Sequence, residues 1–178
     1  MKKINFLKGF TLIEIIIYIF LAVSILLVSS SFAWQIIDNK TKASAITEVQ
    51  QNGRFIIEKL TQEIHQAMGI NNNSSFGINL ALPENAGRFL SLAMRNRTNN
   101  PTVINVLNNF IRMSHGRQPY YQLSSNQVKV TNITFKNYTT GKSSNIKIIL
   151  TIEYLNPPQR QQYQASDTWQ TTVELRDR

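Results

Sequence analysis

An almost unbroken apolar run extends from Phe10 to Val28 near the N-terminus, and a single carboxylate, at Glu14, interrupts it. As a helix rising about 1.5 Å per residue, this run spans roughly 28 Å, close to the thickness of the hydrocarbon layer of a bilayer. An acidic residue inside such a segment costs on the order of 3 kcal/mol and persists mainly where it has a partner or a function. The pattern therefore predicts a membrane-spanning helix with one functional carboxylate.

Polar residues enter the pattern at Gln35, and apolar or small residues then recur in steps of three and four, which places them on one face of a helix. These positions are Ile46, Val49, Gly53, Ile56, Leu60, Ile64 and Ala67. No proline occurs before Pro83, so we expect one continuous helix from about Phe10 to Met68. We expect Gly53 to be its weakest point and Gly69 to end it.

Beyond this helix, alternation of apolar and polar residues predicts β-strands. The pattern is strongest over 146–154 and 169–175, and 128–138 repeats it with a phase slip near Asn132 that is typical of a bulge. Residues 88–94 are a weaker strand candidate, whereas 103–113 has helix-like spacing. Pro157 and Pro158 are expected to end the strand before them. The expected fold is α+β, with a long N-terminal helix packed on a C-terminal antiparallel sheet.

Composition restricts the chemistry of the chain. The formal charge is +9, and no cysteine is present, so no disulfide can form. The three aspartates are not clustered with other acids, so we expect no metal site and no cofactor. Of the two histidines, His65 is expected on a helix surface, and Ser114-His115-Gly116 reads as a turn without an acidic neighbour. No nucleophile with a paired base is evident, so we expect no enzyme and assign no catalytic residue.

The basic residues before the apolar run, Lys2, Lys3 and Lys8, favour a cytoplasmic N-terminus, with the rest of the chain outside the membrane. An alternative is a cleaved secretory signal peptide, with Ser31-Phe32-Ala33 as a small-x-small cleavage site. Glu14 argues against that alternative, because a signal peptide has no use for a carboxylate in its apolar core.

The sequence Gly9-Phe10-Thr11-Leu12-Ile13-Glu14, followed by three isoleucines, resembles the processing signature of type IV pilins and type II secretion pseudopilins. The resemblance implies cleavage after Gly9 by a prepilin peptidase and methylation of the new amino terminus at Phe10. It further implies that Glu14 neutralises the Phe10 amine of a neighbouring subunit in a filament. The expected segments are then a leader (1–9), a transmembrane and polymerisation segment (10–34), an amphipathic helix half (35–69) and a β-rich head (70–178).

A second stretch, from Arg54 to Ala67, resembles the helix of PilW-type minor pilins and J-type minor pseudopilins, although an ordinary solvated helix face explains it equally well. The chain is thus expected to be a minor subunit of a tip or initiation complex, first in a bacterial inner membrane and then in an extracytoplasmic pilus or pseudopilus. Expected partners are the peptidase, other subunits and the membrane. Alternatives are a major pilin, or an adhesive or DNA-binding tip subunit, since the chain without its leader keeps a charge of +6 from 16 basic and 10 acidic residues.

Overall fold

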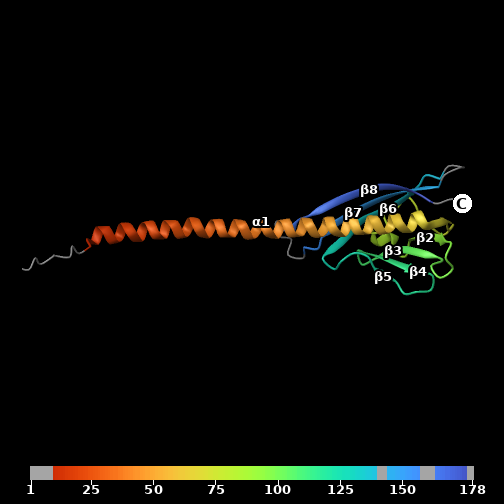
Figure 1. The fold of residues 1–178 in the computed structure, drawn as a ribbon, viewed down its shortest axis with the longest axis horizontal. Coiled ribbons are helices and arrows are strands. Elements are labelled where there is room, and N and C mark those ends of the chain that lie inside the picture. The colour runs from red at the N-terminus through yellow and green to blue at the C-terminus, as the bar shows by residue number, and fades with distance from the viewer. Residues whose placement is uncertain (1–9, 140–143, 157–162, 176–178) are drawn as a thin grey trace, which may run out of the picture. The chain divides into compact units, whose positions relative to one another are not determined.

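The computed structural model describes residues 10–139, 144–156 and 163–175 of the chain. The chain divides into two compact units, Met1–Lys40 and Thr41–Arg178. The second, called the head unit below, contains the sheets and the C-terminal part of the long helix. The fold is α+β, as expected, with one long N-terminal helix followed by antiparallel sheets (Figure 1).

The helix α1 runs from Leu12 to Gln66 without a break, in agreement with the continuous helix that the sequence predicts. In the first unit its large apolar side chains are exposed, among them Ile16, Phe20 and Leu27. Three serines of this unit, Ser24, Ser30 and Ser31, donate their hydroxyls to the carbonyl oxygens four residues earlier, at 2.8, 2.8 and 3.0 Å. By length and composition this helix can cross a membrane.

The end of α1 differs from the expectation. The helix stops at Gln66, and residues Ala67–Ile70 form strand β1, so Gly69 lies within a strand and does not end the helix. Its φ is not positive, so it does not adopt the left-handed conformation of a helix-ending glycine. Ala67 is buried, and β1 pairs antiparallel with the next strand, which supplies partners for backbone groups that a further helical turn would otherwise satisfy.

The first sheet has five strands in the order β1-β2-β3-β4-β5, and all of its neighbours are antiparallel. A short 3₁₀ helix, η1 (Pro83–Asn85), precedes β2. The strands that follow are β2 (Phe89–Met94), β3 (Thr102–Leu107), β4 (Phe110–His115) and β5 (Tyr121–Gln122). The weaker strand candidate 88–94 is therefore confirmed as β2.

The helix-like interpretation of 103–113 is wrong, because this segment is the β3–β4 hairpin. Asn108 and Asn109 have φ of 52° and 64°, the left-handed pair that a two-residue hairpin turn requires and that asparagine tolerates. The buried residues alternate along β3, at Thr102, Ile104 and Val106, and over most of β4, at Ile111 and Met113, although Ser114 is buried too. Val103 and Leu107 are four residues apart, as on one face of a helix, but both lie on strand β3, which ends at the Asn108-Asn109 turn.

The second sheet consists of β6 (Val128–Asn137), β7 (Asn145–Tyr154) and β8 (Ser166–Glu174), all antiparallel. The phase slip near Asn132 is confirmed as an irregularity between Val130 and Asn132, where the β6–β7 register shifts. The strongly alternating segment 146–154 is the central strand of this sheet, and it alternates because one of its faces is buried in the core. Pro157 and Pro158 lie outside the described residues.

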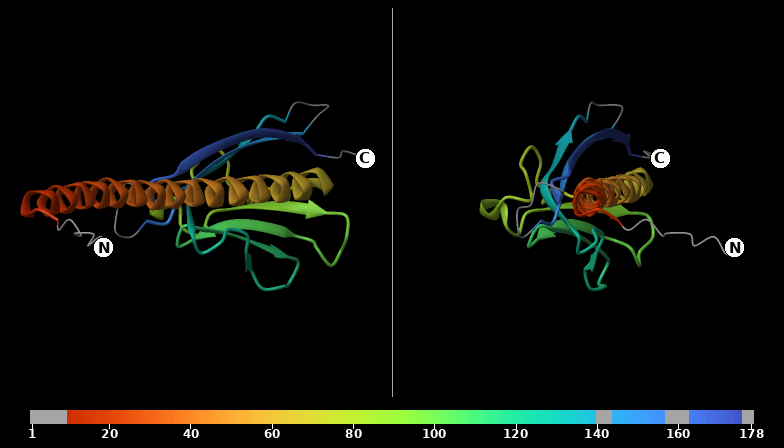
Figure 2. Two further views of the ribbon diagram at one scale, coloured as in Figure 1. Left: turned by 60° about the vertical axis from the view of Figure 1, so that its left-hand side comes forward. Right: turned by 90° about the vertical axis from the view of Figure 1, so that its left-hand side faces the viewer.

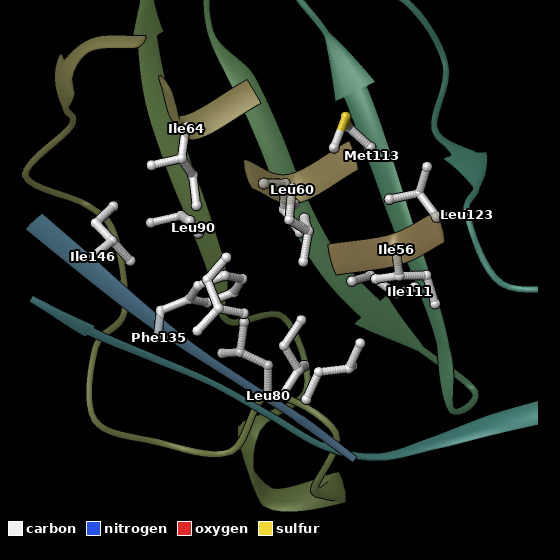
Figure 3. Packing of buried hydrophobic residues seen from close by; sticks show 14 of the residues in the cluster. Ile56, Leu60, Ile64, Leu80, Leu90, Ile111, Met113, Leu123, Phe135 and Ile146 are labelled. Atoms are coloured by element: carbon white, nitrogen blue, oxygen red, sulfur yellow. The ribbon is translucent and has the colours of Figure 1, made fainter. Parts of the chain in front are cut away.

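The core of the head unit lies between the C-terminal part of α1 and the two sheets (Figure 2). The helix contributes Ile56, Leu60 and Ile64, which point toward Leu90, Ile111 and Met113 of the first sheet and Phe135 and Ile146 of the second (Figure 3). The predicted helix face is therefore the buried one, except that Ile46 stays exposed.

Candidate assembly site at the start of the helix

Thr11 precedes the first residue of α1, and its hydroxyl oxygen accepts a hydrogen bond from the backbone N–H of Glu14 at 3.3 Å. The first N–H groups of a helix have no partner within it, and a threonine at this position satisfies one of them. The Thr-x-x-Glu spacing is that of a capping box, and the carboxylate also lies at the positive end of the helix dipole. The cap from Thr11 and the favourable position of the Glu14 carboxylate both stabilise the start of α1 at this point.

The Glu14 side chain is only half-buried, and the hydroxyl of Tyr18, one turn further along, donates to its Oε1 at 3.2 Å. None of the ion pairs among the described residues includes Glu14. Its sequence neighbours Leu12, Ile13 and Ile15 are exposed apolar side chains. The carboxylate therefore keeps unused acceptor capacity on an apolar helix surface.

Phe10 is 71% exposed, and its ring meets the ring of Tyr18 edge to face with centroids 6.3 Å apart. Phe10, Glu14 and Tyr18 therefore form one small group at the start of α1. The contacts of Tyr18 with Glu14 and Phe10 were not predicted from the sequence. The available signal was its position four residues after Glu14, which places the two side chains next to each other on a helix. Gly9, the predicted cleavage position, lies outside the described residues.

A second group of polar side chains lies in the head unit, around the buried carboxylate of Glu63. Lys59 Nζ lies 2.8 Å from Glu63 Oε1, and His115 Nε2 lies 3.3 Å from Oε2. The hydrogen bond to Glu63 raises the pKa of Lys59, and burial raises the pKa of Tyr121, whose ring stacks on His115 at 5.7 Å between centroids. The group links α1 to β4 and β5.

This group corrects the interpretation of Ser114-His115-Gly116. Ser114 and His115 are the last residues of β4, only Gly116 begins a turn, and the acidic neighbour of His115 comes from the helix. His65, in contrast, is exposed, as expected for a helix surface, and its Nδ1 lies 3.1 Å from the carbonyl oxygen of Glu174. Within the described part of the chain, no three His, Cys, Asp or Glu side chains form a group that could hold a metal ion.

Comparison of the chain with protein-family models, with curated proteins and with solved structures gave no match.

Proposed function

We propose that this protein is a pilin-like subunit, anchored by α1 in a bacterial inner membrane and then assembled into a filament. The observation that carries the proposal is the Glu14 carboxylate, which lies in the first turn of an exposed apolar helix and belongs to no ion pair among the described residues. A carboxylate in such a place needs a cation from outside the chain, because an unpaired charge in a membrane or a filament core is costly.

The proposed partner cation is the amino terminus of a neighbouring subunit. Cleavage after Gly9 would create that amine at Phe10, in the same short region as Glu14, so each subunit would supply both an anion and a cation. Methylation keeps the amine charged, and the apolar surface of α1 would then pack against the same helix of other subunits. The role is mechanical, without catalysis.

Within this class we propose a minor subunit that acts in a tip or initiation complex of a pilus or a type II secretion pseudopilus. The second resemblance, over Arg54 to Ala67, favours this assignment. Part of that stretch has a structural explanation in this chain, since Ile56, Leu60 and Ile64 belong to the core of the head unit. The exposed residues of the stretch, such as Arg54 and Glu58, lie outside that core, where an ordinary solvated helix face is the alternative to the resemblance.

The test is intact-mass analysis of the protein purified from cells that contain its prepilin peptidase. We expect a chain that begins at Phe10 and carries one added methyl group, whereas Gly9→Val should keep the full leader, since a larger side chain at the cut site hinders the approach of the backbone. A matched control is Leu7→Val, which alters the leader without touching the cut. A mature chain that begins after Ala33 would identify a secreted soluble domain and overturn the proposal.

A further inference from the structure

Tyr18 contacts both residues on which the proposed assembly mechanism depends. Its hydroxyl donates a hydrogen bond of 3.2 Å to Oε1 of Glu14, and its ring meets the Phe10 ring edge to face, with the ring planes at 78°. One side chain reaches both because Glu14 lies one helical turn earlier, and long side chains on a helix point back over the preceding turn. Tyr18 thus links the carboxylate to the residue that would carry the new amino terminus.

The hydrogen bond from Tyr18 occupies only one oxygen of the Glu14 carboxylate. Among the described residues, the other oxygen, Oε2, takes part in no hydrogen bond and no ion pair. An ionised carboxylate can accept about four hydrogen bonds, so Oε2 keeps its full acceptor capacity. The Glu14 side chain is half-buried, so a donor from another chain can reach this oxygen.

The hydroxyl of Tyr18 differs in its partner from the serine hydroxyls further along α1. Ser24, Ser30 and Ser31 donate to backbone carbonyl oxygens of their own helix, which satisfies them inside an apolar segment. Tyr18 donates to an acidic side chain instead, and a hydrogen bond to an ionised acceptor is about twice as strong as one between neutral groups. The Tyr18 contact therefore acts on Glu14 and not on the helix backbone.

The contact with Phe10 restrains the ring of Tyr18, and the hydrogen bond in turn restrains the Glu14 side chain. A glutamate free on a helix surface exchanges between several rotamers. Immobilising one such side chain on binding lowers an affinity about two- to tenfold, and a side chain that is already held avoids most of this loss. Glu14 is thus held in advance by a neighbour on its own helix.

We propose that Tyr18 is a positioning residue for filament assembly, which holds the Glu14 carboxylate by Oε1 and leaves Oε2 for the amine of a neighbouring subunit. Tyr18 acts through Glu14 and does not itself bind the amine. A buried ion pair is favourable only where further hydrogen bonds satisfy the remaining acceptor sites, and the Tyr18 hydroxyl supplies one of them. This inference rests on the proposed function.

The experiment measures incorporation of full-length variants, as the ratio of the subunit in sheared filaments to that in membranes. Tyr18→Phe removes the hydroxyl and keeps a ring against Phe10, so we expect incorporation to fall about two- to tenfold. Tyr18→Gln removes the ring but places an amide donor four residues after Glu14, within reach on the helix surface. It should recover most of the loss that Tyr18→Phe shows.

The pair of variants separates the hydrogen bond from packing of the ring. A purely structural role of the ring gives the opposite order, with Tyr18→Phe normal and Tyr18→Gln defective, and that result would overturn the proposal. Equal defects in both variants would overturn it too, because a donor at this position would then not be what assembly needs. If Tyr18→Phe is normal while Glu14→Gln is defective, only the inference on Tyr18 fails. Normal incorporation of Glu14→Gln would refute the proposed function as well.

Two controls show that a loss arises at assembly. Intact-mass analysis should find Tyr18→Phe and Tyr18→Gln cleaved and methylated like the wild type, at normal levels in membranes, which excludes a failure of insertion or folding. The matched control for loss of a hydroxyl is Ser30→Ala, since the Ser30 hydroxyl bonds only to the backbone of its own helix. We expect it to be incorporated like the wild type.

Discussion

At the scale of single residues, Glu14 makes two local contacts but belongs to no ion pair among the described residues. Its backbone N–H is capped by Thr11, and its carboxylate accepts one hydrogen bond from Tyr18. Both contacts come from the same chain and do not compensate the negative charge. The hydroxyl of Tyr18 instead supplies a donor that makes the carboxylate less costly in apolar surroundings.

From this follows a prediction for Glu14→Gln, which keeps the shape of the side chain and an acceptor for Tyr18. The variant should be inserted and cleaved normally, because the apolar run becomes less polar. Under the proposed assembly role, its incorporation into filaments should fall by at least about tenfold, because the proposed partner amine of a neighbouring subunit would lose its counter-ion. The measurement is the ratio of the subunit in sheared filaments to that in membranes.

Ser24→Ala is the control for this experiment, since Ser24 lies in the same helix and its hydroxyl bonds only to the backbone of its own helix. It should be incorporated like the wild type. If Glu14→Gln is also incorporated normally, the carboxylate has no role in assembly and the charge-pairing mechanism is wrong.

At the scale of secondary-structure elements, the contact between α1 and β8 depends on a glycine. The sequence marks Gly53 as a weak point of the helix, and the structure gives a reason for its presence. Gly53 is buried, and a Cβ at this position would overlap the six-membered ring of Trp169 on β8. The helix therefore gives up some of its own stability so that the second sheet can pack closely against it.

The contact between Gly53 and Trp169 predicts whether Gly53→Ala raises or lowers the stability of the head unit. In an isolated helix Gly53→Ala should stabilise by about 1 kcal/mol, but overlap with a packed indole ring should destabilise by about 1–3 kcal/mol. We expect a net destabilisation of the head unit, seen as a lower midpoint in thermal unfolding. Gln51→Ala, on an exposed position of the same helix, is the control and should change the midpoint little. A rise in the midpoint for Gly53→Ala would show that the Trp169 ring moves aside freely.

At the scale of the whole molecule, the chain combines two units with different requirements. The first exposes an apolar helix surface that needs lipid or other subunits around it. The head unit, in contrast, contains the whole buried apolar cluster, from Val49 to Leu175. Its folding should therefore need nothing from the first unit.

We predict that a chain beginning at Thr41 is soluble, monomeric and cooperatively folded. This truncation also removes Trp34, so that Trp169 becomes the sole tryptophan and reports directly on the contact between β8 and α1. The measurement is urea unfolding followed by tryptophan fluorescence and by circular dichroism, whose transitions should coincide. Separate transitions, or aggregation of the truncated chain, would show that the head unit depends on the N-terminal helix.

The sequence by itself determined the long helix, its buried face, the strong strands and the bulge near Asn132, because each depends on a periodic pattern within one segment. Glu14 could also be singled out from sequence, since a charge in an apolar run is visible without a fold. The tertiary structure alone decided the β3–β4 hairpin, the end of α1 in a strand, the pairing of His115 with Glu63 and the reason for Gly53. The hairpin depends on the left-handed turn at Asn108 and Asn109, which leaves no periodic pattern in the sequence. The other three depend on residues far apart in the chain, whose proximity follows from strand pairing and core packing.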